Sequence, residues 1–137
     1  MQFSAHGRKF SGCVALLWHG LCLNFRSDLA PFILCVMPAF NEARNLGMVR
    51  TAYALAALQQ LSPQIELIVV DDGSQDDAAR VMQGLCAAHI QVLYLKLSRN
   101  FGKEYALTAG LDAARGEVVV MMDADGQHAM SLLPLML

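Results

Sequence analysis

The sequence predicts an α/β fold with a mostly parallel sheet and flanking helices. Four short apolar runs alternate with three segments of helical periodicity, the pattern of strands joined by right-handed helical crossovers. A polar cluster follows each apolar run. Hydrophobic residues make up 55% of the 137 residues and charged residues 16%, which excludes intrinsic disorder and fits a single buried core. We therefore expect one Rossmann-like domain.

The first half of this domain is predicted from two apolar runs and the segment between them. Residues 32–37 form a continuous apolar run that Pro38 ends, as expected for a strand buried on both faces. Asn41 is the expected N-cap of a helix that continues to about Gln60. Residues 65–70, rich in β-branched side chains, predict the second strand.

The middle of the domain continues the alternation. A turn at residues 71–74 leads into a second helix, for which Ser74 or Asp76 is the expected cap. Residues 92–97 predict the third strand, and residues 98–102 the loop that follows it.

The last elements complete the predicted sheet. A third helix is expected over residues 103–115 with Gly116 at its C′ position, followed by a fourth strand over residues 117–122. In the usual strand order 3-2-1-4, the first and fourth strands are neighbours. We expect the polar clusters that follow them to face each other across a crevice, where open α/β sheets bind ligands.

The opening segment differs from this pattern. Arg8 and Lys9 precede an apolar stretch at residues 13–18, which resembles a secretory signal, but polar residues interrupt the stretch and no Ala-x-Ala site follows. We interpret residues 1–30 as a poorly specified extension and residues 31–137 as the folded unit.

Composition excludes several classes of partner. Ten Lys and Arg against twelve Asp and Glu give a net charge of −2, which predicts no nucleic-acid partner. No apolar run reaches the roughly 18–20 residues of a spanning helix, so no transmembrane helix is predicted. The four cysteines have no CxxC spacing, which argues against a zinc site or disulfide framework and favours reduced thiols in the cytoplasm.

Two carboxylates after the fourth strand are the sharpest candidates for chemistry. Asp123 and Asp125 lie two residues apart, and Gln127 adds an oxygen at the next alternate position. Crowded carboxylates favour a cation between them, and hard oxygen ligands suit Mg²⁺ or Mn²⁺. By spacing alone, an acidic turn that merely ends the strand is an equal alternative.

The other polar clusters each allow two interpretations. Asp71 and Asp72 are placed to accept hydrogen bonds from a base or a ribose, or they are ordinary turn residues. We expect Asp72 to lie in a solvent-facing turn rather than in the core. Arg99 and Lys103 are placed to contact a diphosphate, or they are solvated charges. Neither a GxGxxG nor a GxxxxGK[ST] motif occurs, so the common nucleotide-binding fingerprints give no support to rival folds.

Four motifs together resemble a known family. They are VMPAFNEARNL at 36–46, IVVDDGSQD at 68–76, SRNFGK at 98–103 and MDADGQH at 122–128. In this order they resemble the N-terminal half of a family 2 glycosyltransferase of GT-A fold, over roughly residues 33–130. The most similar group is the polyprenyl-phosphate transferases, such as dolichol-phosphate mannosyltransferases and bactoprenol glucosyltransferases.

The resemblance implies a nucleotide-sugar site. It implies that Pro38, Phe40 and Glu42 line the nucleotide pocket, and that Val70 and Asp72 contact the base and ribose. Arg99 and Lys103 belong to the motif that the resemblance places near the donor. The resemblance further implies a DxD element made by Asp123, Ala124 and Asp125, with Gln127 as a third metal ligand for Mg²⁺ or Mn²⁺.

The implied reaction is inverting, metal-dependent transfer of a sugar from a UDP- or GDP-sugar to a polyprenyl phosphate. The phosphate acceptor is already a nucleophile, so no catalytic base is assigned. The family implies work at the inner face of a membrane, with the acceptor half beyond Leu137. We therefore expect this chain to bind donor without transferring the sugar.

Two alternatives remain open at this point. One is a non-catalytic nucleotide-sugar-binding remnant of such an enzyme. The other is a receiver-like phosphoacceptor module that uses Asp71, Asp72 and Asp123, although such a module needs its acidic pair after the first strand rather than the second.

Overall fold

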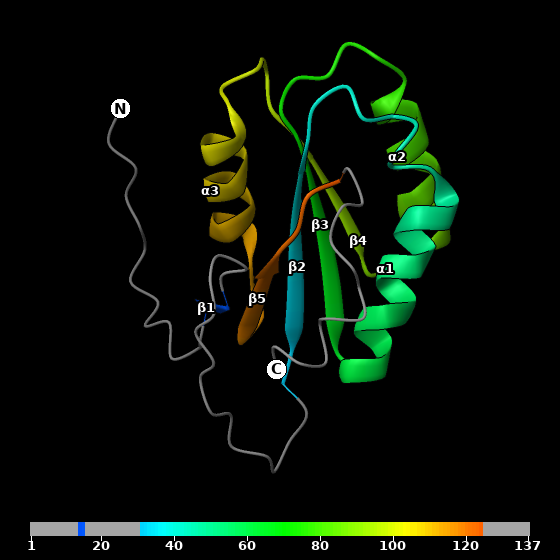
Figure 1. The fold of residues 1–137 in the computed structure, drawn as a ribbon, viewed down its shortest axis with the longest axis vertical. Coiled ribbons are helices and arrows are strands. Elements are labelled where there is room, and N and C mark those ends of the chain that lie inside the picture. Colours follow the sequence, from blue (N-terminus) through cyan, green and yellow to red (C-terminus); the bar gives the residue numbers. More distant parts are fainter. Residues whose placement is uncertain (1–13, 16–30, 125–137) are drawn as a thin grey trace.

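A computed structural model describes residues 14–15 and 31–124 (Figure 1). Its sheet has five strands in the order β1-β5-β2-β3-β4, and every pair of neighbours is parallel. The strands are β1 (Val14–Ala15), β2 (Ile33–Ala39), β3 (Ile65–Asp71), β4 (Val92–Lys96) and β5 (Val118–Met121). The helices are α1 (Met48–Leu61), α2 (Ala78–Ala88) and α3 (Lys103–Ala113). The predicted α/β class and the predicted order of the four main strands are confirmed.

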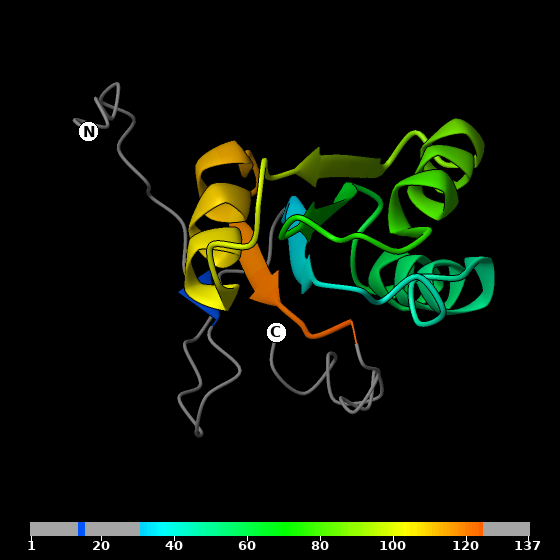
Figure 2. The ribbon, with the colours of Figure 1, turned by 90° about the horizontal axis from the view of Figure 1, so that it is seen from above.

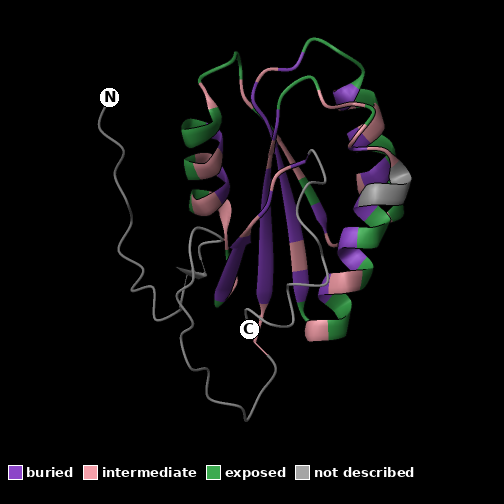
Figure 3. Ribbon diagram, viewed as in Figure 1, coloured by how far each residue is buried: buried purple, intermediate pink, exposed green. Residues whose placement is uncertain are grey.

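Helices cover both faces of the sheet, and Figure 2 shows the resulting three layers. Alternate residues of β2 face opposite ways, as a strand requires. Ile33, Cys35 and Met37 pack in the core beneath α1 and α2, whereas Leu34 and Val36 pack beneath α3. The central strands are therefore buried on both faces, as Figure 3 shows.

The first helix begins later than its sequence pattern predicts. Asn41 is expected to cap a helix, but α1 starts at Met48. Asn41 instead has a positive φ of 55°, and the backbone N–H of Leu46 donates to the carbonyl of Glu42 in a separate turn. Asn tolerates this left-handed conformation better than most residues, so the chain turns here before the helix forms.

The ends of α2 and α3 also refine the prediction. The N-cap of α2 is Asp77 rather than Ser74 or Asp76, although the carboxylate of Asp76 accepts the N–H of Ala78, the first residue of α2. However, α3 ends at Ala113, so Gly116 is not its C′ residue. A Cβ at Gly116 would lie 2.9 Å from the Cβ of Leu34, and close packing against β2 is the physical reason for glycine at this position.

Two-residue strand β1 lies within the segment for which the sequence predicts no element. Val14 pairs with Val119 and Ala15 with Val120, which places β1 beside β5 at one edge of the sheet. The rest of residues 1–30 lies outside the described residues. No helix in the described part of the chain combines the length and the apolar character that crossing a bilayer requires.

Candidate functional site

A pocket of about 370 Å³ lies at the carboxyl edge of the sheet. This edge of the sheet is toward the top of Figure 1. Its walls come from the segments that follow β2, β3, β4 and β5 and from the start of α3. The lining residues are Pro38, Ala39, Phe40, Glu42, Asp72, Asn100, Gly102, Lys103, Ala106, Asp123 and Ala124. The polar clusters that the sequence places after separate strands therefore meet around one cavity.

Pro38 lies inside strand β2 rather than ending it. It pairs with Val70 of β3, and β2 continues to Ala39. On its other side, the last hydrogen bond to the β5 segment runs from the N–H of Met122 to the carbonyl of Val36. The next bond of this parallel ladder would need an N–H at position 38, which proline lacks. Pro38 thus ends the pairing of β2 with β5, and these two segments separate at the pocket.

Asp72 is buried and holds a neighbouring loop. The sequence predicts a solvent-facing turn here, but only 3% of Asp72 is exposed. Its two carboxylate oxygens accept the backbone N–H groups of Phe101 at 2.7 Å and Gly102 at 2.8 Å. The expectation of a solvent-facing residue is wrong because the loop after β4 folds over this turn.

A glycine makes this close approach possible. Gly73 has a φ of +76°, and a Cβ there would lie 2.4 Å from the carbonyl carbon of Arg99. No other residue would fit without moving the loop. Asp72 and Gly73 together join the turn after β3 to the loop that leads into α3.

Phe40 and Glu42 form another part of the pocket wall, and Asn41 between them in sequence is fixed by hydrogen bonds. The N–H of Asn41 donates to Ser74 Oγ at 2.8 Å, and its side-chain oxygen accepts the N–H of Gln75 at 2.9 Å. We name this pair of bonds, with the bond from the N–H of Ala43 to Asp76 Oδ2 at 2.9 Å, the 41–76 latch. It attaches the wall to the turn before α2.

Asp71 has a structural role beside the pocket. It is fully buried, one carboxylate oxygen accepts the N–H of Ser74 at 2.6 Å, and the other accepts the hydroxyl of Tyr94. The pKa of Tyr94 is raised above its usual range, mainly by burial and secondly by the hydrogen bond to Asp71. The hydroxyl therefore stays protonated and donates to Asp71.

Lys103 and Asp123 form an ion pair at the pocket. The ammonium Nζ of Lys103 lies 2.6 Å from Oδ1 and 2.8 Å from Oδ2 of Asp123. The Lys103 side chain is 60% exposed and the Asp123 side chain 31% exposed. The pair places one positive and one negative group at the same edge of the cavity.

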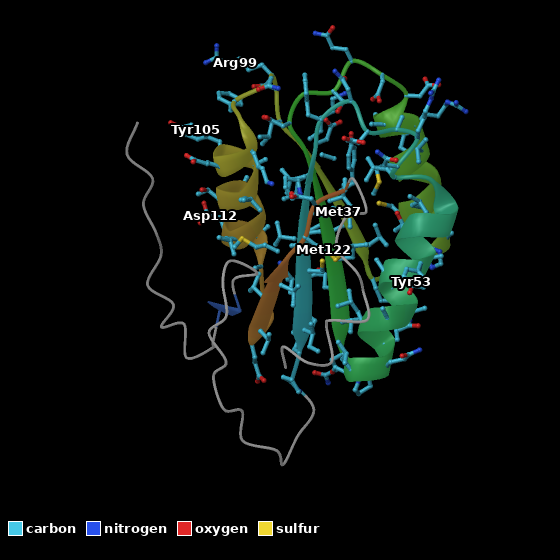
Figure 4. The ribbon with its side chains drawn as sticks, in the orientation of Figure 1. Met37, Tyr53, Arg99, Tyr105, Asp112 and Met122 are labelled. Atoms are coloured by element: carbon cyan, nitrogen blue, oxygen red, sulfur yellow. The ribbon has the colours of Figure 1, made fainter. Side chains whose placement is uncertain are left out.

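Not every predicted site residue lines the pocket. Val70 is fully buried and faces α3, where a Cβ at Gly110 would lie 3.1 Å from its side chain. Arg99 lies outside the lining, with its guanidinium 4.7 Å from the ring centre of Phe101, near the start of α3 in Figure 4. Asp125 and Gln127 lie outside the described residues.

Four lining residues were not singled out from the sequence: Ala39, Asn100, Gly102 and Ala106. Asn100 and Gly102 belong to the SRNFGK motif, and Gly102 has a φ of +102° at the start of α3. A glycine directly before a helical segment is the signal that points to this turn. Small residues such as Ala39 carry no such signal.

The structure describes one residue of the predicted metal site, the carboxylate of Asp123. Within residues 14–15 and 31–124, no group of three or more His, Cys, Asp or Glu side chains is placed to hold a metal ion. Of the three predicted ligands, Asp123 is the described one, and its partly exposed oxygens face the cavity beside Lys103. Hard oxygen donors of this kind fit Mg²⁺ or Mn²⁺.

Comparisons with known proteins agree with this architecture. Residues 34–137 match the family model described as glycosyl transferase family 2. The chain is 36% identical over 106 residues to an undecaprenyl-phosphate 4-deoxy-4-formamido-L-arabinose transferase of Pseudomonas fluorescens, covering 75% of this chain and 30% of that protein. It is 35% identical over 103 residues to a bactoprenol glucosyl transferase of Shigella phage SfV, covering 74% of this chain and 33% of that protein.

A solved structure shows the same fold. The mannosyltransferase PcManGT from Pyrobaculum calidifontis, in complex with GDP-Man and Mn²⁺, superposes with a TM-score of 0.61 at 26% identity. The match covers 69% of this chain and 28% of that one. The chain spans about a third of the length of the curated relatives that it matches.

Proposed function

The chain belongs to glycosyl transferase family 2, and from this premise we propose that its pocket binds the nucleotide-sugar donor of a polyprenyl-phosphate glycosyltransferase. The observation that carries the proposal is the convergence of Pro38, Glu42, Asp72, Lys103 and Asp123 on one cavity. This cavity lies where β2 and β5 separate, and open α/β sheets bind nucleotides at such a position. Residues 31–137 then form the donor-binding half of the enzyme.

The donor has two chemically different parts, and the pocket lining offers groups suited to each. Phe40 and Glu42 offer an aromatic surface and a carboxylate, which suit the base and ribose. Lys103, beside Asp123, suits the diphosphate. We propose that the donor is a UDP- or GDP-sugar that contacts both groups of residues.

A divalent cation completes the proposed site. Asp123, with Asp125 and Gln127 from the same motif, would hold Mg²⁺ or Mn²⁺ through oxygen atoms. When bound, the ion would neutralise charge on the departing nucleoside diphosphate. The complex of PcManGT with GDP-Man and Mn²⁺ supports this choice of donor and ion.

The proposed acceptor is a polyprenyl phosphate. Two relatives carry names that specify undecaprenyl phosphate and bactoprenol, and they support this class of acceptor. A phosphate oxygen attacking the anomeric carbon from the face opposite the nucleotide would invert the configuration. Such an acceptor lies in a membrane, and we propose that the enzyme works at the inner face.

Calorimetric titration of the chain with UDP- and GDP-sugars, with Mn²⁺ or with EDTA, tests the proposal. We expect binding that EDTA abolishes and that Asp123→Ala weakens at least tenfold. Asp112→Ala, which removes an exposed carboxylate from α3, is the matched control and leaves the affinity unchanged. Equal affinity in EDTA and in Mn²⁺ would refute the metal-dependent site.

A further inference from the structure

The starting observation is that both carboxylate oxygens of Asp123 are already occupied by a cation. Lys103 Nζ lies within 2.8 Å of each of them. A divalent ion on Asp123 needs at least one of the same oxygens, and it would lie against the ammonium group with like charge. Lys103 and the metal therefore compete for one carboxylate.

The backbone is held in place at both Lys103 and Asp123, whereas the Lys103 side chain is free to move. Lys103 is the first residue of α3, and Asp72 anchors the preceding Gly102 through its N–H. Asp123 follows Met122, whose N–H donates to the carbonyl of Val36 at 3.0 Å. Since 60% of the Lys103 side chain is exposed, its ammonium can turn from Asp123 toward the cavity without disturbing the fold.

We propose that Lys103 is a resident counter-ion of Asp123 that changes partner when the donor binds. Without ligand, Lys103 neutralises Asp123. With the nucleotide and a divalent cation bound, Asp123 would hold the cation and the ammonium of Lys103 would bind the diphosphate. This inference rests on the proposed function and assigns Lys103 as a diphosphate-binding residue that couples metal binding to nucleotide binding.

The exchange predicts effects of opposite sign on two ligands. Removing the ammonium frees Asp123, so Mn²⁺ alone binds more tightly. The same change removes a cation from the diphosphate, so UDP or GDP binds more weakly in the presence of Mn²⁺. If Lys103 only supported the local structure, its removal would weaken the binding of both Mn²⁺ and the nucleotide.

The test measures Mn²⁺ binding to the full chain by electron paramagnetic resonance of the free ion, first without nucleotide. We expect Lys103→Met to bind Mn²⁺ about two- to fivefold more tightly than the unchanged chain, the range of an exposed ion pair. Calorimetry with UDP and GDP at saturating Mn²⁺ is expected to show about fivefold weaker nucleotide binding.

Two control variants separate the ion pair from other effects. Arg80→Met removes the same charge from another ion pair, between Arg80 on α2 and Asp77 directly before that helix, and we expect no change in either affinity. Lys103→Arg keeps the positive charge, so its affinity for Mn²⁺ should equal that of the unchanged chain rather than that of Lys103→Met. Thermal melts confirm that each variant is folded.

The outcomes are distinguishable. If Lys103→Met binds Mn²⁺ no more tightly than Arg80→Met while the unchanged chain binds Mn²⁺ with nucleotide, the exchange is refuted and the proposed function stands. If no variant binds Mn²⁺ even with UDP or GDP, the proposed function fails and this inference fails with it.

Discussion

Gly110 in α3 packs directly against Val36 in β2, since a Cβ at position 110 would lie 2.3 Å from Val36 Cγ1. The helix can lie this close to the sheet because its contact residue has no side chain. Lys103 at the start of the same helix is thereby brought to the pocket, where it reaches Asp123. A packing contact in the core thus helps to determine the geometry of the site.

Adding a methyl group at this contact should destabilise the fold although alanine favours helices. We expect Gly110→Ala to lower the free energy of unfolding by about 1–3 kcal/mol, because Val36 must move. Gly84→Ala in α2, where no atom lies within 4 Å of the added Cβ, should raise it by about 0.5–1 kcal/mol. Urea denaturation compares the two, and equal shifts would contradict the close packing.

Asp72 should matter for stability as well as for binding. Asp72→Ala leaves the N–H groups of Phe101 and Gly102 without their acceptors, and we expect a loss of about 2–3 kcal/mol in unfolding free energy. Asp72→Asn keeps one acceptor oxygen and should lose about half as much. Chemical denaturation of the three proteins measures this order, and an unchanged stability of Asp72→Ala would mean that the loop does not depend on this carboxylate.

The 41–76 latch should affect donor binding through the pocket wall. Asn41→Ala removes the acceptor for the N–H of Gln75 and disfavours the positive φ, so we expect about 1–2 kcal/mol of destabilisation and several-fold weaker nucleotide binding. Asn41→Gly permits the same φ and should lose less stability. The comparison uses thermal melts and calorimetry, and a larger loss in the glycine variant would contradict the role of backbone conformation.

Tyr94 should make stability depend on alkaline pH. Its pKa is raised in the folded chain, so the unfolded chain loses the phenolic proton first as the pH rises. This contribution to stability is complete below about pH 10, the unfolded value, and is lost as the pH rises toward the folded pKa. We expect Tyr94→Phe to lower stability by about 1–2 kcal/mol at pH 7, because Asp71 loses a partner, and to flatten the alkaline decline.

Urea denaturation at pH 7, 9 and 10.5 measures both effects of the Tyr94 substitution. Tyr53→Phe is the control, since Tyr53 is 61% exposed on α1 and lies at the surface in Figure 4. It should leave both the stability and its pH dependence unchanged. A Tyr94→Phe variant with the same alkaline decline as the unchanged chain would show that another group titrates there.

Much of the fold could be predicted because its signals are local. A strand buried on both faces requires a continuous apolar run, and the runs at 32–37 and 65–70 contain most of the residues of β2 and β3. The end of β2 differs from the prediction, since Pro38 is compatible with a strand when its missing N–H falls where the ladder with β5 ends. The start of α1 differs from the prediction because Asn41 adopts a turn that its bonds to the distant residues Ser74 and Gln75 stabilise.

The alternation of strands and helices follows from local sequence patterns, and it brings the polar clusters to one edge of the sheet. The four motifs resemble the family to which the chain belongs. Three features depend on the packing of distant segments: Asp72 is buried under a loop, Val70 faces α3, and Lys103 meets Asp123 across 20 positions of sequence. Periodicity reports which side chains are buried, whereas these contacts depend on how closely separate elements pack, and residues such as Gly73 and Gly110 set that distance.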